Sequence, residues 1–249
     1  MQLLLVSDLH YALRQLDWLV ERAADFDVVV IAGDTLDIAS VVPLDAQIVV
    51  VLEYLARLRE LTTLIVSSGN HDLVGADEHG EQSALWLREA ASAGIPTDGA
   101  SVALGDTLVT VCPWWDGPLG REAVAAQLAG DAAVRPQRWI WVYHWPPAGS
   151  PTCWTGRRDY GDGDLGGWIA EHRPDLVLSG HVHQSPFVED GNWADRVGGA
   201  WVLNAGNQRG PVPARIEIDL DRAAATWYSL MGAETADLSA ATAPARTVF

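Results

Sequence analysis

The feature that most constrains this chain of 249 residues is a series of short apolar runs, each followed by charged, amide or imidazole residues. These runs cover residues 3–6, 28–32, 64–66, 139–143 and 176–178. Near-continuous apolar runs of this length are typical of strands buried on both faces. Ligands bind beyond the carboxyl ends of strands in α/β sheets. The polar residues that follow the runs are therefore candidates for one common site.

Helical patterns separate the apolar runs, at residues 13–24, 44–61, 81–93, 121–128 and 165–171. This alternation predicts an α/β architecture with parallel strand pairs. Two hairpin-like pairs add antiparallel strands, at 101–104 with 108–112 and at 215–220 with 224–230. We therefore expect two packed sheets of mixed direction within one domain, residues 1–231. Residues 232–249 have no periodicity and are expected to form a tail.

The polar residues at the ends of the runs are of the types that bind metals. They occur as Asp8-Leu9-His10, Gly33-Asp34-Thr35-Leu36-Asp37, Gly69-Asn70-His71-Asp72, His144 and Gly180-His181-Val182-His183. Carboxylate, amide and imidazole ligands together suit Mn, Fe or Zn. The candidate ligands are Asp8, His10, Asp34, Asn70, His144, His181 and His183. These seven exceed the number that one metal in an open catalytic site uses, so two metals are expected. Asp34 is the natural ligand to share, because a carboxylate has two oxygens.

The ordered set resembles the calcineurin-like metallophosphoesterase superfamily, whose motifs are D-x-H, G-D-x-x-D, G-N-H-[DE], H and G-H-x-H. The resemblance spans Asp8 to His183, with every motif position filled. It implies an α/β fold, a four-layer αββα sandwich of two mixed β-sheets flanked by helices. It also implies two metal sites, one formed by Asp8, His10, Asp34 and His183, and the other by Asp34, Asn70, His144 and His181.

The resemblance further implies a mechanism in which a hydroxide that bridges two metals attacks phosphorus in line. His71 would protonate the leaving oxygen, and Asp37 would orient His71 and favour its protonated form. The phosphatase branch of the superfamily has Arg-Gly after the second motif, whereas Ile38-Ala39 follows Asp37 here. This departure favours the bacterial phosphodiesterase side of the superfamily.

Charge narrows the substrate class. The net charge is −17, which opposes binding of double-stranded nucleic acid. We expect a small phosphodiester, nucleotide-type esters included, as substrate. A nuclease acting on single strands and a phosphomonoesterase are the alternatives. A non-catalytic metal-binding scaffold is least favoured, because the ligands and His71 are all present.

Residues outside the motifs are candidates for substrate contacts. Trp145 follows ligand His144, and Arg157 and Arg158 lie in a glycine-rich loop that suits a lid. The tryptophans of the run at 139–143 are expected to pack on one strand face. Two cysteines and the absence of a signal peptide or apolar span favour a cytoplasmic protein without a membrane partner. A homodimer is compatible with the sequence.

Overall fold

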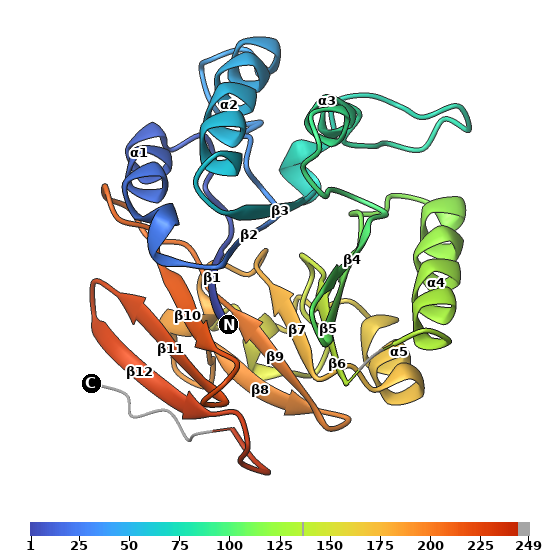
Figure 1. Cartoon of the computed structure of the whole chain (residues 1–249), viewed down its shortest axis with the longest axis vertical. Helices are drawn as coiled ribbons and strands as arrows, with labels where there is room; N and C mark the ends of the chain where they lie inside the picture. Colours follow the sequence, from blue (N-terminus) through green and yellow to red (C-terminus); the bar gives the residue numbers. More distant parts are fainter. Residues whose placement is uncertain (136, 244–249) are drawn as a thin grey trace.

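The computed structural model describes residues 1–135 and 137–243 (Figure 1). One six-stranded sheet has the order β12-β11-β10-β1-β2-β3, in which β1, β2 and β3 are parallel and the other neighbours antiparallel. We call it the first sheet. Its strands are β1 (Gln2–Val6), β2 (Val28–Ala32), β3 (Thr63–Ser67), β10 (Arg215–Asp219), β11 (Ala224–Ser229) and β12 (Gly232–Asp237).

The second sheet also has six strands, in the order β4-β5-β6-β7-β9-β8. The four inner strands are parallel, and β4 and β8 pair antiparallel at the edges. Its strands are β4 (Ser101–Leu104), β5 (Thr107–Val111), β6 (Arg138–Val142), β7 (Leu176–Ser179), β8 (Ala194–Val197) and β9 (Ala200–Asn204). Both sheets are therefore mixed, as the sequence predicts.

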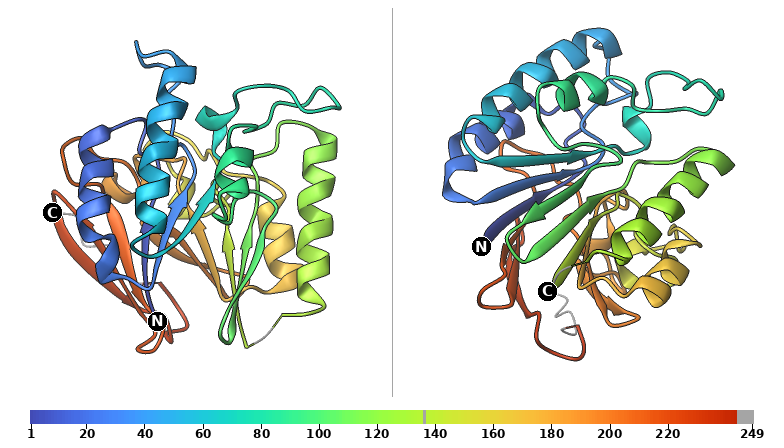
Figure 2. Two further views of the ribbon diagram at one scale, coloured as in Figure 1. Left: turned by 45° about the horizontal axis from the view of Figure 1, so that its top comes forward. Right: turned by 45° about the vertical axis from the view of Figure 1, so that its right-hand side comes forward.

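Helices cover the outer face of each sheet (Figure 2). Those on the first sheet are α1 (Leu13–Arg22), α2 (Leu44–Arg59) and α3 (Leu87–Ser92). Those on the second sheet are α4 (Pro118–Ala132) and α5 (Leu165–His172). Single turns of 3₁₀ helix occur at Ala23–Asp25, Asn70–Asp72, Pro151–Cys153 and Ser185–Phe187. The arrangement confirms the expected four-layer αββα sandwich.

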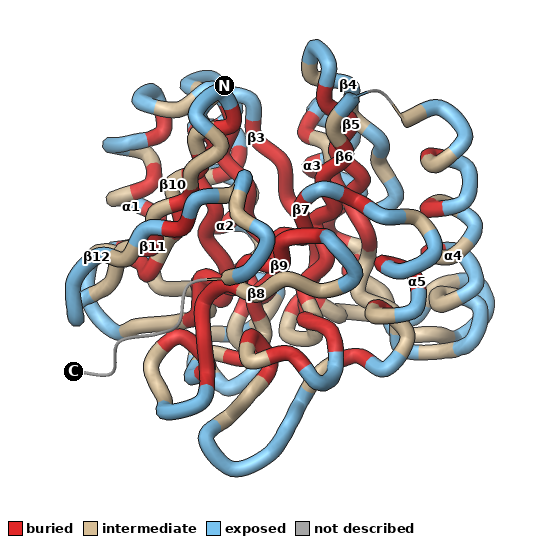
Figure 3. The backbone as a smooth tube through the Cα atoms, turned by 90° about the horizontal axis from the view of Figure 1, so that it is seen from below, coloured by how far each residue is buried: buried red, intermediate tan, exposed pale blue. Residues whose placement is uncertain are grey.

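Alternation along the strands distributes apolar side chains among three buried layers. In β1, Leu3 and Leu5 face the second sheet, whereas Leu4 and Val6 pack under the helices of the first sheet. The inner strands that carry continuous apolar runs are accordingly buried along both faces, whereas the edge strands β4 and β12 are largely exposed. Most other exposed residues lie in helices and loops (Figure 3). Trp139 and Trp141 pack together against α4 and α5, as expected from their alternation.

Two sequence predictions of secondary structure are wrong in part. The helix expected over 81–93 covers only Leu87–Ser92, because the side chain of Glu81 hydrogen-bonds the start of α4. The tail expected from residue 232 instead begins with β12, which pairs with β11 along its length. Residues 244–249 of that tail lie outside the described residues.

Candidate metal centre

The loops that follow β1, β2, β3, β6 and β7 bring the predicted ligands together at one edge of the two sheets. Two groups of possible ligands share Asp34, and within each group the ligand atoms lie within 4.8 Å of one another. A further group of this kind consists of His10, Asp37 and His71. The first group is Asp8, His10, Asp34 and His183, and the second is Asp34, His144 and His181. Asn70 joins the second group, since its Oδ1 lies 2.8 Å from Nδ1 of His181.

Nitrogens and oxygens converge closely in the first group. Nε2 of His183 lies 3.1 Å from Asp8 Oδ1 and 2.9 Å from Nε2 of His10. His10 Nε2 lies 3.8 Å from Asp34 Oδ2. Asp8 and Asp34 are fully buried beneath this surface, whereas His183 is partly exposed. The group is thus open on the imidazole side.

A backbone carbonyl orients the central imidazole of the second group. Nδ1 of His144 donates to the Ala32 carbonyl oxygen at 2.5 Å, which turns Nε2 toward the carboxylates. Nε2 of His144 lies 3.3 Å from Asp34 Oδ2, in a geometry that makes no hydrogen bond. In most metal-binding histidines, the ring nitrogen that does not face the metal is fixed by a hydrogen bond like that of Nδ1 to Ala32.

The electrostatic environment shifts the pKa values of His144 and His181 in opposite directions. Burial lowers the pKa of His144, but the carboxylates of Asp34 and Asp8 outweigh this effect and raise it to about 9. Burial and the charge on His144 lower the pKa of His181 to about 3. The pKa values of Asp8 and Asp34 lie below the ordinary value despite burial, because histidines surround both carboxylates. The carboxylates are therefore ionised where a cation would need them.

These residues fit a metal centre. Nε2 of His144 and Nε2 of His181 are buried and have no hydrogen-bond partner among the described residues. A buried polar atom without a partner is costly unless something else satisfies it. Both histidines belong to the second ligand group, together with the ionised carboxylate of Asp34. A divalent cation can bind the imidazole nitrogens and the carboxylate oxygens at the same time.

Backbone strain is concentrated at the ligands themselves. Asp8, His10, Asp34 and His181 all have positive φ angles, between 44° and 64°. Residues other than glycine adopt this conformation rarely, and it occurs mostly where function requires it. Gly69 permits a close approach to one of these ligands, since a Cβ there would lie 2.3 Å from Asp34 Oδ1. The ligand loops are therefore held in conformations that their own residues do not favour.

Three polar side chains support the ligand loops. Asp72 accepts hydrogen bonds from the backbone of Thr35, Leu36 and Gly69, which ties the second motif to the third. Burial raises the pKa of Asp72 to about 7. The side chain of Asn204 donates to the Thr152 and Val182 carbonyl oxygens, and that of Asn207 donates to the Asp8 carbonyl oxygen.

Gln47 is a positioning residue that the sequence analysis missed. Its side chain accepts from the backbone N–H of Asp37 and donates to the Asp37 and Val42 carbonyl oxygens. It is fully buried on the face of α2 that carries Val51 and Leu55. A polar residue on that apolar stripe is the signal that could have identified it.

His71 and Asp37 lie beside the first ligand group. The His71 ring contacts the His10 ring edge-on, with 4.5 Å between centroids. Nδ1 of His71 lies 3.7 Å from Asp37 Oδ1, beyond hydrogen-bond distance, and 3.4 Å from the backbone nitrogen of Ile38. The structure therefore places the predicted pair together without a direct hydrogen bond.

A cavity of about 330 Å³ opens over the ligands. Its walls are Asp34, Asn70, His71, Thr155, Arg158, Tyr160, His181, Val182, His183 and Gln184. Arg158 is its one lining arginine, and the guanidinium lies over the Tyr160 ring, 5.1 Å from the centroid. The Tyr160 ring also stacks on His181, with 5.1 Å between ring centroids.

The other two predicted substrate residues lie elsewhere. Trp145 stacks on Trp114, contacts His181 and donates to the Tyr160 carbonyl oxygen. It packs beside the ligands and is not part of the cavity wall. Arg157 is exposed and also lies outside that wall. The structure thus brings Arg158 to the ligands and leaves Arg157 in the loop.

Comparison with known proteins agrees with this fold. A family model described as calcineurin-like phosphoesterase matches residues 1–185, so the chain belongs to that family. No curated protein sequence matches the chain. Within residues 1–135 and 137–243, no helix has the length and apolarity needed to cross a membrane.

Solved structures share the fold at low sequence identity. A protein from Thermus thermophilus is 17% identical with a TM-score of 0.59, over 95% of this chain and 98% of that one. A dimetal phosphatase from Danio rerio is 12% identical with a TM-score of 0.60, over 94% and 98%. A purple acid phosphatase from yellow lupin is 13% identical with a TM-score of 0.56, over 100% of this chain and 57% of that one.

Proposed function

We propose that the chain hydrolyses a small phosphodiester with two metal ions bound at this centre. The observation that supports it most directly is the pair of ligand groups that share Asp34. Asp8, His10, Asp34 and His183 would hold one ion, and Asp34, Asn70, His144 and His181 the other. Mn, Fe and Zn suit this mixture of oxygen and nitrogen ligands. When bound, such ions act as Lewis acids toward phosphoryl oxygens and lower the pKa of water.

His71 serves as the general acid in this proposal. It lines the cavity and contacts the ring of His10, so a leaving oxygen held at the ligands is within its reach. Asp37 Oδ1 lies 3.7 Å from Nδ1 of His71, where its carboxylate would orient the imidazole. Gln47 fixes the backbone of Asp37 and thereby the distance between the two side chains.

Arg158 is the proposed contact to the non-bridging phosphate oxygens. It lines the cavity, and the structure gives its guanidinium a ring contact but no ion pair with a described carboxylate. An unpaired guanidinium is suited to bind phosphate in a bidentate way.

The size of the cavity, about 330 Å³, supports a small ester, nucleotide-type esters among them. Trp145 acts through Tyr160 and His181, and Arg157 would reach substrate only if the loop moved.

The net charge of −17 supports a small soluble substrate over a nucleic acid. We also propose a cytoplasmic location. The competing proposals for the activity are a single-strand nuclease and a phosphomonoesterase. Rising salt distinguishes the nuclease, because a protein that binds many phosphates loses affinity steeply as salt increases. A homodimer would not alter the ligand set.

The test measures hydrolysis of bis(p-nitrophenyl) phosphate and p-nitrophenyl phosphate by metal-free protein reloaded with Mn²⁺. We expect metal-dependent cleavage that is faster on the diester, and losses of about 100-fold or more in His71→Ala and Asn70→Ala. His79→Ala is the matched control, because His79 is exposed and pairs only with Glu78. Metal uptake without turnover of either ester would refute the proposal, and faster monoester cleavage would refute the diesterase assignment.

A further inference from the structure

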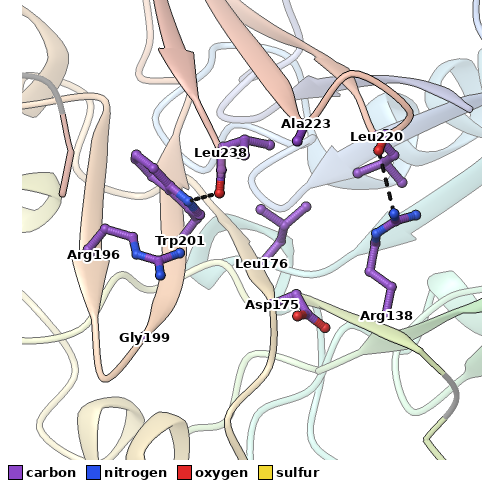
Figure 4. Close-up of a pocket in the computed structure, with 9 residues that line it drawn as sticks. All are labelled: Arg138, Asp175, Leu176, Arg196, Gly199, Trp201, Leu220, Ala223 and Leu238. Carbon is purple, nitrogen blue, oxygen red and sulfur yellow. Dashed lines mark hydrogen bonds between the residues drawn. The ribbon is translucent and has the colours of Figure 1, made fainter. Parts of the chain in front are cut away.

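A second cavity, of about 240 Å³, lies at the end of the sandwich opposite the metal centre. It borders the first residues of β6 and β7, whereas His144 and His181 follow the last residues of these strands. Its walls are Arg138, Asp175, Leu176, Arg196, Gly199, Trp201, Leu220, Ala223 and Leu238 (Figure 4). We call it the distal pocket. It belongs to no part of the proposed catalytic machinery.

Two arginines enter the distal pocket from opposite sides, with Leu176 between them (Figure 4). The guanidinium of Arg196 makes no hydrogen bond or ion pair with another described residue, and its Nε is buried. It lies over the Trp201 ring, 5.3 Å from the centroid. A buried guanidinium nitrogen without a partner is costly, and an anion would satisfy it.

The second guanidinium is held only by long contacts. Arg138 donates to the Leu220 carbonyl oxygen and to Thr107 Oγ1, each at 3.4 Å, and lies 3.8 Å from Asp106. These distances are at or beyond the upper limit of good hydrogen bonds. Arg138 can therefore turn to an incoming anion with little loss.

The carboxylate in the wall does not cancel these charges. Asp175 Oδ2 accepts from the backbone of Trp139 at 2.8 Å and faces Arg135 at 3.6 Å. Asp175 is thus already paired outside the pocket. The pocket has a positive balance in a protein whose net charge is −17. Such a concentration of charge is typical of anion sites.

The apolar part of the wall indicates the shape of the ligand. Leu176, Leu220 and Leu238 lie between and around the two guanidinium groups (Figure 4). Leu176 and Leu220 are themselves buried, so they hold the two guanidinium groups apart and present little apolar surface to a ligand. A short molecule with an anionic group at each end would reach both arginines across Leu176.

We propose that the distal pocket binds a compact organic dianion of the dicarboxylate type, with one carboxylate at Arg196 and the other at Arg138. The volume of the pocket is smaller than that of most ligand pockets, which suits a short molecule and excludes a dinucleotide. The proposal does not depend on the catalytic function.

Calorimetric titration of the metal-loaded protein with glutarate tests the proposal, with acetate as the single-charge probe. We expect glutarate to bind more tightly than acetate, and Arg196→Gln and Arg138→Gln each to weaken glutarate binding about tenfold or more. Arg222→Gln is the matched control, since it removes the same charge from an exposed side chain outside the wall. Its affinity for glutarate should equal that of the unmodified protein.

A local signal separates this pocket from any carboxylate binding at the metals. The indole N–H of Trp201 donates to the Leu238 carbonyl oxygen within the wall, so its NMR cross-peak should shift with glutarate. The shift should be lost in Arg196→Gln, whose ester hydrolysis should stay unchanged. If Arg196→Gln fails to fold, Arg138→Gln carries the test. Equal binding of glutarate and acetate, or no effect of either arginine variant, would overturn the proposal.

Discussion

The dependence of the metal centre on single atoms is clearest at Gly33. A Cβ on Gly33 would lie 2.3 Å from Nδ1 of His144, the nitrogen that donates to Ala32. Its φ of +86° also strains any other residue. We predict that Gly33→Ala displaces the imidazole and lowers kcat/KM about 100-fold or more, because small misplacements in a site cost this much. Steady-state kinetics and metal titration measure the effect.

Gly94→Ala provides the control for backbone strain alone. Gly94 has φ +87°, but a Cβ added there would have nothing within 4 Å. This variant should lose about 1 kcal/mol of stability and keep full activity. Similar kinetic losses in both variants would show that the contact with His144 is not the cause.

The carboxyl group of Asp98 makes the free energy of unfolding depend on pH. Burial raises the pKa of its carboxyl to about 7, although the carboxylate accepts from Ser68 N at 2.8 Å. The folded state keeps this proton up to about pH 7, and the unfolded state only up to about pH 4. The free energy of unfolding therefore falls as pH rises through this window and levels off above it.

Asp98→Asn removes this titration while an amide oxygen still accepts from Ser68. We predict that its Tm exceeds that of the unmodified protein by an amount that grows between about pH 4 and pH 7, reaching about 10 °C. Calorimetry across the pH range measures it. A Tm difference independent of pH would contradict the assignment.

The candidate ligands could be predicted from sequence because the polar clusters that contain them follow apolar runs typical of buried strands. Gln47 could not, because its role depends on hydrogen bonds to a loop that the sequence alone does not fold. The same holds for the distance between His71 and Asp37, which the conformation of that loop sets. Functional residues that follow a strand end can be predicted from sequence. Residues that position them through tertiary hydrogen bonds cannot.

At the scale of elements, Glu81 shows how a distant contact overrides a local pattern. Its carboxylate accepts from the backbone N–H groups of Leu119 and Gly120, at 2.9 and 2.7 Å, in the first turn of α4. These N–H groups have no partner within the helix, and an acidic group there also offsets the helix dipole. The segment before α3 is consequently drawn away from a helical path.

We predict that Glu81→Ala destabilises the protein by about 1 kcal/mol, as loss of a helix cap does. Thermal unfolding should show a Tm lower by about 3 °C for a chain of this size. Glu78→Ala is the control, because Glu78 is 87% exposed and pairs only with His79. Equal Tm values for the two variants would refute the capping role.

Strand β12 escaped prediction because its sequence, Gly-Ala-Glu-Thr-Ala-Asp, has little strand propensity. Pairing with β11 and contacts with the second sheet stabilise it instead. The indole of Trp193 donates to Glu234, and that of Trp201 donates to the Leu238 carbonyl oxygen just beyond β12. The strands predicted correctly were those with continuous apolar runs and those of the two hairpin-like pairs, β4 with β5 and β10 with β11.

A chain ended after residue 231 should therefore lose at least about 2 kcal/mol of stability, since two indole N–H groups lose their partners. It should also aggregate more readily, because the edge of β11 becomes exposed. A chain ended after residue 243 keeps β12 and serves as the control. Denaturant unfolding and sedimentation compare the two, and equal stability would show that β12 is dispensable.

At the scale of the whole molecule, the candidate metal centre joins the two sheets. Asp8 and Asp34 follow strands of the first sheet, whereas His144, His181 and His183 follow strands of the second. Asp8 and Asp34 are buried together with His144 at this edge, whereas His181 and His183 are partly exposed. Bound metal would thus stabilise the packing of one sheet on the other as well as the site.

Removal of metal should consequently lower the stability of the entire fold. With metal at about a thousand times its Kd, binding adds about 4 kcal/mol, which corresponds to a rise in Tm of about 10 °C for a chain of this size. We predict a shift of this order between chelated and Mn²⁺-loaded protein in calorimetry. Asp34→Asn weakens the ligand that both groups share, so its Tm should respond far less to Mn²⁺. A Tm that is the same with and without metal would contradict a centre that links the sheets.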